Sequence, residues 1–404
     1  MSNGAASRDS GSTTSTVEKA KEAAAATVRA AGEGLVDLSH RIHAHPELSF
    51  EEERASSWCA DALADAGFAV TQGICDLPTA FSASFGSGPF VVGICCEYDA
   101  LPDVGHACGH NVIAAAAVGA GIGLARIADE LGCTIRVLGT PAEEGGGGKI
   151  LMLDRGGFDG VNASLMVHPW PSELIQMPCL AVSHFDVDYT GRAAHASAFP
   201  ELGVNAADAI TVAQVAVGLL RQHASPGNQV HGIVTLGGAA PNIVPAHTRA
   251  KYYVRARTLD ELALWEPRVH RCFEAGALAT GATCAIVPQG PVYSEFRADE
   301  TMAAVYKRNA EALGRRFAEA GDKVVAASTD MANVSLAIPA IHPTLGLDSL
   351  PAVNHQAEFA AHCVTDIADR AVLDGAIAMA WTVADLAADT EQRARLCART
   401  YSAA

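Results

Sequence analysis

Residues 90–111 read FVVGICCEYDALPDVGHACGHN, an apolar run followed by a cluster of acidic, cysteine and histidine residues. The run is rich in β-branched residues, which predicts a strand buried on both faces. Two similar runs follow, TIRVLGT at 134–140 and ASLMV at 163–167, with helix-like sequence separating the runs. This alternation predicts an α/β fold in which helices flank a mainly parallel sheet.

Potential metal ligands gather where these strands end, which is where the active sites of parallel sheets lie. They are Cys108, His110, Glu143, Glu144, His168 and, far down the chain, His355. Adjacent buried carboxylates such as Glu143 and Glu144 are costly unless a cation is near. Each group alone also fits a plain structural role, as a tight turn, an exposed acidic loop or a hydrogen-bonded histidine. Together, their nitrogen, sulfur and oxygen atoms favour a metal centre.

From residue 184 to residue 289 the segments follow a different order. HFDVDYT, HGIVTL, AKYYVRA and TCAIVPQ read as strands, and NAADAITVAQVAVGLLRQH and LDELALWEPRVHRCFEAGALA as helices. The order β-α-β-β-α-β is that of a ferredoxin-like α+β domain, although Pro267 is unfavourable inside the second helix. We therefore predict a larger domain of residues 16–183 and 297–404, interrupted by an inserted domain of residues 184–296.

The N-terminal residues 1–15 are rich in Ser, Thr and Gly and predict a disordered leader. Ser15 and Glu18 fit a capping box, and apolar residues then recur at helical spacing until Pro46, which predicts one long helix. The leader lacks the basic start and apolar core of a secretory signal. The eleven cysteines, an odd number, read as reduced thiols, so we expect a cytoplasmic protein.

Charge and hydropathy exclude two classes of partner. A net charge of −17 opposes binding to nucleic acid or to an anionic membrane. The apolar run at residues 112–125 is shorter than the ~18 residues that a membrane span needs. We expect a small-molecule substrate, with neither nucleic acid nor membrane as a partner.

The ordered motifs CEYDALPDVGHACGHN, GTPAEEGGGGK and STDMANVS make this sequence resemble a known family. It is similar, from HAHPELSFEEE to NHQAEF, to the dinuclear-metal amidohydrolases and peptidases that include carboxypeptidase G, the aminoacylases and the auxin-conjugate hydrolases. Within this family it is most similar to the branch of β-alanyl-lysine dipeptidase and aminobenzoyl-glutamate hydrolase. The resemblance implies a homodimeric, metal-dependent amidohydrolase acting on a dipeptide or an N-acyl amino acid. It also implies that residues 16–183 and 297–404 form the catalytic domain and that residues 184–296 form a lid or dimerisation domain.

The resemblance also implies roles for individual residues. Cys108 would bridge two divalent ions, with zinc expected first and manganese, cobalt or nickel as alternatives. The other metal ligands would be His110, Glu144, His168 and His355. Glu143 would be the general base that takes a proton from a metal-bound water as this water attacks the amide carbonyl. In the inserted domain, His195 would support the oxyanion, and Asn242 and Arg255 would hold the substrate.

One position departs from the family pattern. Asp99 matches the aspartate that orients a metal-bound histidine in many relatives, but Glu97 stands where that histidine would be. The role of Asp99 therefore stays open, and His106 is interpreted as structural. The alternatives are a non-catalytic metal-binding or scaffold protein on the same fold, and a hydrolase that holds a single metal ion.

Overall fold

The computed structural model describes residues 9–318 and 327–403, and the chain divides into two compact units. Unit 1 comprises Met1–Met177, Phe296–Val325 and Asn333–Ala404, and unit 2 comprises Pro178–Glu295 and Ala326–Ala332. The sequence analysis set the boundaries after residues 183 and 296. The catalytic, lid and dimerisation roles given to these parts remain predictions.

A six-stranded sheet with the strand order β1-β2-β4-β3-β5-β11 lies at the centre of unit 1. Its strands are β1 (Ala69–Gln72), β2 (Phe81–Phe85), β3 (Phe90–Glu97), β4 (Cys133–Thr140), β5 (Ala163–Leu165) and β11 (Ala340–Ile341). The four strands β4, β3, β5 and β11 run parallel, whereas β2 is antiparallel to β1 and β4. A separate parallel pair joins β6 (His168–Trp170) to β12 (Thr344–Gly346). The predicted mainly parallel sheet is confirmed.

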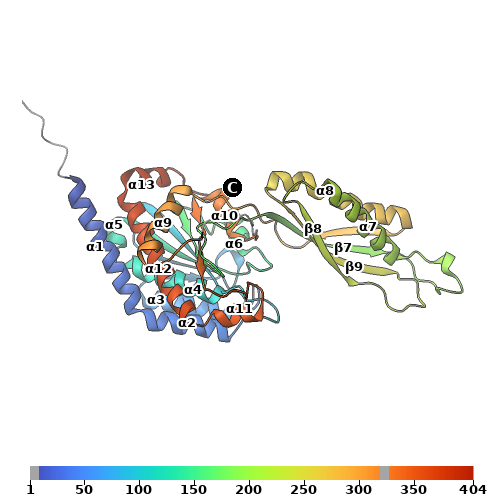
Figure 1. The fold of residues 1–404 in the computed structure, drawn as a ribbon, viewed down its shortest axis with the longest axis horizontal. Helices are drawn as coiled ribbons and strands as arrows, with labels where there is room; N and C mark the ends of the chain where they lie inside the picture. Colours follow the sequence, from blue (N-terminus) through green and yellow to red (C-terminus); the bar gives the residue numbers. More distant parts are fainter. Residues whose placement is uncertain (1–8, 319–326, 404) are drawn as a thin grey trace, which may run out of the picture. The chain divides into compact units, whose positions relative to one another are not determined.

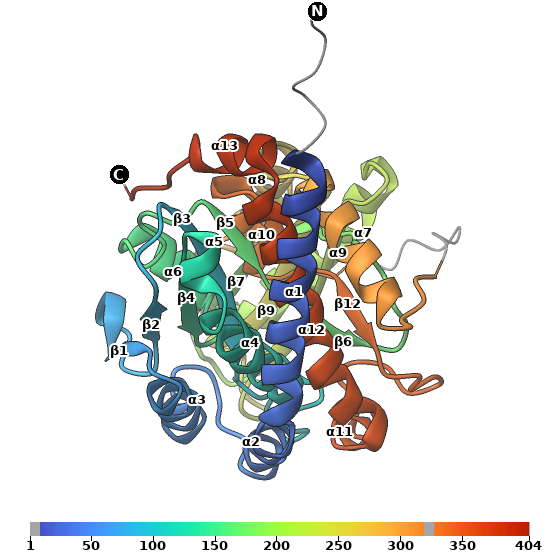
Figure 2. The same ribbon diagram turned by 90° about the vertical axis from the view of Figure 1, so that its left-hand side faces the viewer.

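Helices pack around this sheet in layers. They are α1 (Asp9–Ala30), α2 (Gly32–Ala44), α3 (Glu53–Asp65), α4 (His110–Ala125), α5 (Ala128–Leu131), α6 (Gly148–Asp154), α9 (Glu300–Ala312), α11 (Ala357–His362), α12 (Asp366–Ala388) and α13 (Thr390–Cys397). The apolar α4 packs directly on β3 and β4, α12 packs against α4, and α1 lies along both helices (Figure 2). The short α10 (Met331–Ala337) contains the last boundary between the two units.

The N-terminal region forms two helices, so the prediction of one long helix is wrong. The chain leaves α1 after Ala30 and begins α2 at Gly32. Gly32 and Gly34 lie just after the break, and glycine weakens a helix by roughly 1 kcal/mol relative to alanine. Ser15 does not cap this region, because α1 begins six residues earlier, at Asp9. Residues 1–8 of the predicted leader lie outside the described residues.

The long helix α12 has the length and composition of a membrane span. However, 72% of its most apolar 18-residue window is buried, because the helix packs against α4, α1 and α9. The core helix of a soluble protein has the same length and composition, so α12 is only a weak indication of a membrane span.

Unit 2 has a four-stranded antiparallel sheet with the strand order β10-β7-β9-β8. Its elements are β7 (Ala181–Thr190), α7 (Ala206–Leu220), β8 (Gln229–Leu236), β9 (His247–Ala256), α8 (Leu259–Thr280) and β10 (Thr283–Pro288). Both helices cover one face of the sheet (Figure 1) and close a core that contains Phe185, Trp265 and Phe273. The predicted ferredoxin-like domain is confirmed. Pro267 lies inside α8, which continues through it because Trp265 and Val269 are buried on either side.

Candidate metal centre

The loops at the carboxyl ends of β3 and β4 bring the predicted ligands together. β3 ends at Glu97, and α4 begins at His110, two residues after Cys108. Gly109 joins them with a φ of 79°, and a Cβ atom there would lie 2.8 Å from the ring of Pro169. Glycine is required at this position because other residues avoid both this φ and this close approach.

The second loop follows β4, which ends at Thr140, and carries Glu143 and Glu144. Ala142, just before them, has a φ of 58°, in the left-handed region that a non-glycine residue rarely adopts. The backbone N–H of Glu144 donates to Asp99 Oδ2 at 2.9 Å. The glycine run that follows packs closely against the ring of Phe50, because a Cβ atom on Gly146 would lie 2.3 Å from this ring.

Five predicted ligands converge on one point. The sulfur of Cys108 lies 3.6 Å from His168 Nε2 and 3.7 Å from His355 Nε2. His355 Nε2 lies 3.7 Å from Glu144 Oε2, and the backbone N–H of His355 donates to Ala107 O. These atoms form two groups that can each hold a metal ion: Cys108, His110 and His168, and Cys108, Glu144 and His355. Cys108 belongs to both groups, as the sequence-based hypothesis of a bridging cysteine requires.

Hydrogen bonds orient two histidines so that the same ring nitrogen faces this cluster. Nδ1 of His110 lies 3.0 Å from Asp99 Oδ1, and Nδ1 of His168 lies 2.7 Å from the carbonyl oxygen of Pro169. An oxygen acceptor places a proton on Nδ1, so that a neutral ring carries its lone pair on Nε2. This is the usual arrangement of metal-bound histidines. Asp99 therefore retains the orienting contact to a histidine, although that histidine is His110.

Three buried polar atoms test whether the residues fit a metal ion. Glu97 Oε1, His110 Nε2 and Glu144 Oε1 are buried, and none of them makes a hydrogen bond of good geometry among the described residues. His110 Nε2 lies 3.0 Å from Glu97 Oε1 and 3.7 Å from Glu144 Oε1. Buried polar atoms normally have partners, so polar atoms that converge in this way fit around a divalent cation. The set of imidazole, thiolate and carboxylate donors suits zinc and similar ions.

A third group of potential ligands includes Glu143, together with Glu97 and His110. The geometry thus allows Glu143 as well as Glu144 to be a ligand, and the division of roles between these two glutamates stays a prediction. Glu97 also forms an ion pair with Lys149. The side chains of Glu97 and Lys149 are both fully buried, so each charge is balanced where water is excluded.

The cluster changes the pKa values of its members. Burial and the charge of Glu144 raise the pKa of the Cys108 thiol well above its ordinary value. Burial raises the pKa of Glu144 to about 7, although His110 opposes this change. Burial, helped by His110, lowers the pKa of His168 to about 4. A neutral His168 is ready to bind a metal ion, whereas Cys108 must lose its proton on binding.

Sequence reasoning missed two residues that contribute to this environment. Lys149 ends the motif GTPAEEGGGGK, but no role was predicted for it. His342 is buried, and its ring centroid lies 5.5 Å from that of His168. The signal for His342 was the repeated His-Pro at residues 168–169 and 342–343, near the paired strands β6 and β12. His106, interpreted as structural, is buried and is absent from the three potential ligand groups found among the described residues.

Unit 2 carries the three remaining predicted residues. His195 is exposed, and its Nδ1 accepts hydrogen bonds from the backbone N–H groups of Ser197 and Ala198 at 3.3 and 3.2 Å. These donors keep Nδ1 unprotonated, so a neutral His195 carries its proton on Nε2. His195 is paired with Ile243, which places it beside Asn242, whose carbonyl oxygen accepts from Ala196 N–H. His195 is therefore set to donate a hydrogen bond from Nε2.

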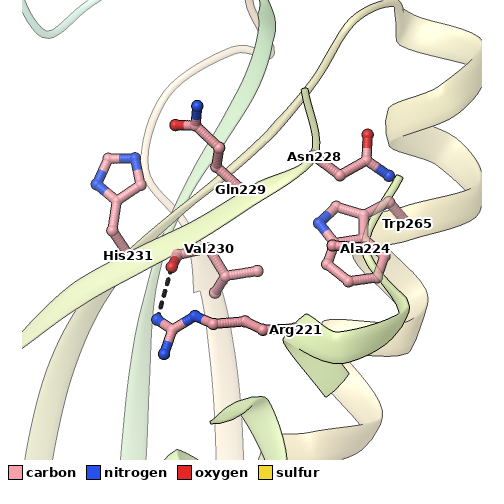
Figure 3. Close-up of a pocket in the computed structure, with 7 residues that line it drawn as sticks. All are labelled: Arg221, Ala224, Asn228, Gln229, Val230, His231 and Trp265. Carbon is pink, nitrogen blue, oxygen red and sulfur yellow. Dashed lines mark hydrogen bonds between the residues drawn. The ribbon is translucent and has the colours of Figure 1, made fainter. Parts of the chain in front are cut away.

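The side chain of Arg255 is fixed by hydrogen bonds and is not a solvated charge on the surface. Its Nε donates to His231 Nε2 at 3.1 Å and its guanidinium NH1 donates to Ser328 Oγ at 2.6 Å. His231 also lines a cavity of about 480 Å³ in unit 2, shown in Figure 3, where Arg221 donates to the carbonyl oxygen of Val230. The contacts fix the orientation of the Arg255 guanidinium before any ligand binds.

Comparison with known proteins identifies the class of protein that this fold and these side chains define. The chain belongs to the peptidase family M20/M25/M40, whose family model matches residues 95–373. It is therefore a hydrolase of C–N amide bonds.

Among its relatives is the Xaa-Arg dipeptidase of Mus musculus, which is 37% identical over 389 residues, 92% of this chain and 89% of the relative. One of the subunits of the p-aminobenzoyl-glutamate hydrolase of Escherichia coli is 35% identical over 268 residues, 61% of this chain and 56% of the relative. The resemblance to the branch of aminobenzoyl-glutamate hydrolase is confirmed.

A solved structure supports the fold. The Bacillus subtilis YXEP protein, described as a dinuclear metal binding peptidase from the M20 family, superposes with a TM-score of 0.62. The match covers 88% of this chain and 98% of that protein at 21% sequence identity.

Proposed function

We propose that this chain is a dipeptidase that uses two divalent metal ions, with zinc as the first expectation. The observation that carries the proposal is the convergence of Cys108, His110, Glu144, His168 and His355, whose ligand atoms form two groups that can each hold a metal ion. The contact of Cys108 with ligands from both groups supports a bridging role. Manganese, cobalt and nickel are the alternative metals, because the same donor types bind them.

The charges of the buried groups support two ions rather than one. With Cys108 as a thiolate, the cluster contains five anionic groups, which also include Glu97, Asp99 and the two adjacent glutamates. Lys149 balances one of these charges through its ion pair with Glu97. The remaining four negative charges match two divalent cations, whereas a single ion would leave two buried charges uncompensated.

The residues of this chain then divide the work of hydrolysis. When bound, two divalent ions would polarise the substrate carbonyl and make water a stronger acid. Glu143 takes the proton from the attacking water and later delivers it to the leaving amine. His195 donates a hydrogen bond from Nε2 to the oxyanion, a contribution of about 3 to 4 kcal/mol for a single donor in other enzymes.

For the substrate, we propose a dipeptide whose C-terminal residue is basic. Two relatives that cover most of the chain, from mouse and human, are named Xaa-Arg dipeptidase. The net charge of −17 would attract a cationic substrate. Asn242 and the preorganised Arg255 would hold its carboxylate, because a guanidinium and an amide side chain both donate to carboxylate oxygens.

The test is a substrate screen with purified protein loaded with zinc, manganese, cobalt or nickel. The substrates are dipeptides ending in Arg, Lys, Leu or Glu, N-acetyl amino acids and p-aminobenzoyl-glutamate, and the readout is release of the free amine. We expect the highest kcat/KM for dipeptides ending in Arg or Lys. Cleavage of N-acyl amino acids alone would overturn the dipeptide assignment, and a metal count of one ion per active chain would overturn the dinuclear centre.

We also propose a homodimer formed through unit 2. Strand β8 is at the edge of its sheet and exposes Ile233 (65%), Val234 (41%) and Leu236 (40%). An exposed apolar edge strand favours pairing with another chain, and a second copy pairs in the same way by symmetry. For the compartment, we propose the cytoplasm, because all eleven cysteines are free.

A further inference from the structure

A buried carboxylate outside the ligand set contacts the loop that carries Glu143 and Glu144. Glu52 immediately precedes helix α3 and is fully buried. Its side chain does not cap this helix. The capping role belongs to Glu47, whose carboxylate accepts from the backbone N–H groups of Arg54 and Ala55 at 3.0 Å. Glu52 is therefore free to reach a loop 90 residues further along the chain.

Glu52 is bonded to two residues with an unfavourable backbone conformation. Its Oε1 accepts from the N–H of Ala142 and from the N–H of Phe50, both at 2.9 Å. Ala142 has a φ of 58° and Phe50 a φ of 66°. Residues other than glycine persist in this region only when the surrounding structure holds them there. The other oxygen, Oε2, accepts from the hydroxyl of Thr79 at 2.8 Å.

The backbone of Glu143 is consequently held on both sides by buried carboxylates. The N–H of Ala142, which precedes it, donates to Glu52, and the N–H of Glu144, which follows it, donates to Asp99. The two carboxylates differ in the other groups that they contact. Asp99 also orients His110, whereas Glu52 contacts none of the predicted metal ligands in its described hydrogen bonds.

We propose that Glu52 is a positioning residue for the proposed base: its carboxylate holds Ala142 in the left-handed conformation and so sets the direction in which Glu143 projects. The proposal rests on the proposed function, because it assigns the proton transfer to Glu143. Misplacing a reacting group by about 1 Å can cost about a hundredfold in rate. Glu52 would thus control kcat without contacting substrate or metal.

Three substitutions separate positioning from general stability. Glu52→Ala removes the acceptor, and we expect kcat to fall by about ten- to a hundredfold while KM and bound metal change less than about twofold. Glu52→Gln keeps an acceptor for both N–H groups and should keep kcat within about threefold. Ala142→Gly in the Glu52→Ala background should recover at least about fivefold in kcat, because glycine adopts this φ without support.

Thr79→Val is the matched control. It removes the third hydrogen bond of Glu52 without touching the loop, so it should lower the unfolding temperature but leave kcat unchanged. A Glu52→Ala variant with normal kcat would overturn the proposal. So would a kcat loss that Ala142→Gly does not rescue, or an equal kcat loss in Thr79→Val.

Hydrogen–deuterium exchange makes the test independent of the proposed function. A peptide covering residues 141–148 should exchange faster in Glu52→Ala than in the wild type, while a peptide from α12 should not. Faster exchange in a protein that hydrolyses none of the tested amides would support the role of Glu52 in fixing the loop. The same result would refute the proposal that the chain is a dipeptidase. Unchanged exchange in an active enzyme would refute only the proposal that Glu52 fixes the loop.

Discussion

The charge on Glu52 should make the stability of this protein depend on pH in a predictable direction. Burial, helped by the charge of Asp99, raises the pKa of Glu52 from 4.5 to about 7. Between these values the folded protein keeps a proton that the unfolded chain has released. Raising the pH removes this proton and leaves a buried charge, so stability falls as the pH rises.

The size of the effect follows from the same two values. A pKa raised from 4.5 to about 7 corresponds to about 3 kcal/mol at high pH, and about 2 kcal/mol of this develops between pH 5.5 and 8.5. Glu52→Gln has the same shape and no proton to lose. Relative to wild type, this variant should gain about 2 kcal/mol in the free energy of unfolding over that range.

The assay is urea unfolding of both proteins, saturated with the same metal, at several pH values between 5.5 and 8.5. Metal binding also depends on pH, but it affects both proteins alike and cancels in the difference. The matched control is Glu51→Gln, because Glu51 is the exposed neighbour of Glu52. A stability difference that stays constant with pH would refute the reasoning, since it would mean that the charge is solvated or paired in the folded state.

Four further predictions concern the site and the assembly. Glu143→Ala should abolish turnover but keep the bound metal. If Glu143 is a ligand, elemental analysis of this variant would show that the metal is lost as well. Cys108 should resist alkylation in the metal-loaded protein and react after chelation, whereas equal labelling would remove it from the metal. Mixing inactive Glu143→Ala and His195→Ala chains should restore up to about half of the sites in mixed dimers, if His195 acts on the partner's site. Lys149→Met should destabilise the apoprotein by about 3–5 kcal/mol, and adding Glu97→Gln should restore much of this loss, unless the ion pair is dispensable.

The sequence was sufficient for the parts of the fold that depend on local pattern. The apolar runs at residues 90–96, 134–140 and 163–167 became strands β3, β4 and β5, and the six segments of unit 2 appear in the predicted order. Burial on both faces leaves a continuous apolar run, burial on one face leaves an alternation, and both patterns can be read directly from the sequence. The break at Ala31 was missed because the apolar spacing continues across it.

The site shows a different limit. The predicted ligands were recognisable because Cys108 and His110, and likewise the paired glutamates, stand in short motifs. Glu52 stands among three consecutive glutamates and nothing local distinguishes it from Glu51 or Glu53, which are exposed. Its importance comes from a contact with Ala142, 90 residues away. The same holds for Lys149 and Glu97, whose pairing across 52 residues exists only once the sheet has formed.

Two segments near the ends of the long stretch of unit 2, Pro178–Glu295, are bonded to each other. Val182 donates to Tyr293 O at 2.9 Å, and Tyr293 donates to Val182 O at 3.0 Å. The stretch between Val182 and Tyr293 therefore starts and ends at neighbouring points of the backbone. Recombination or protein engineering can replace the intervening 110 residues with a short turn or with another folded module without straining the rest of the chain. The family's diversity of substrates could grow by such exchange, leaving the metal ligands in unit 1 unaltered.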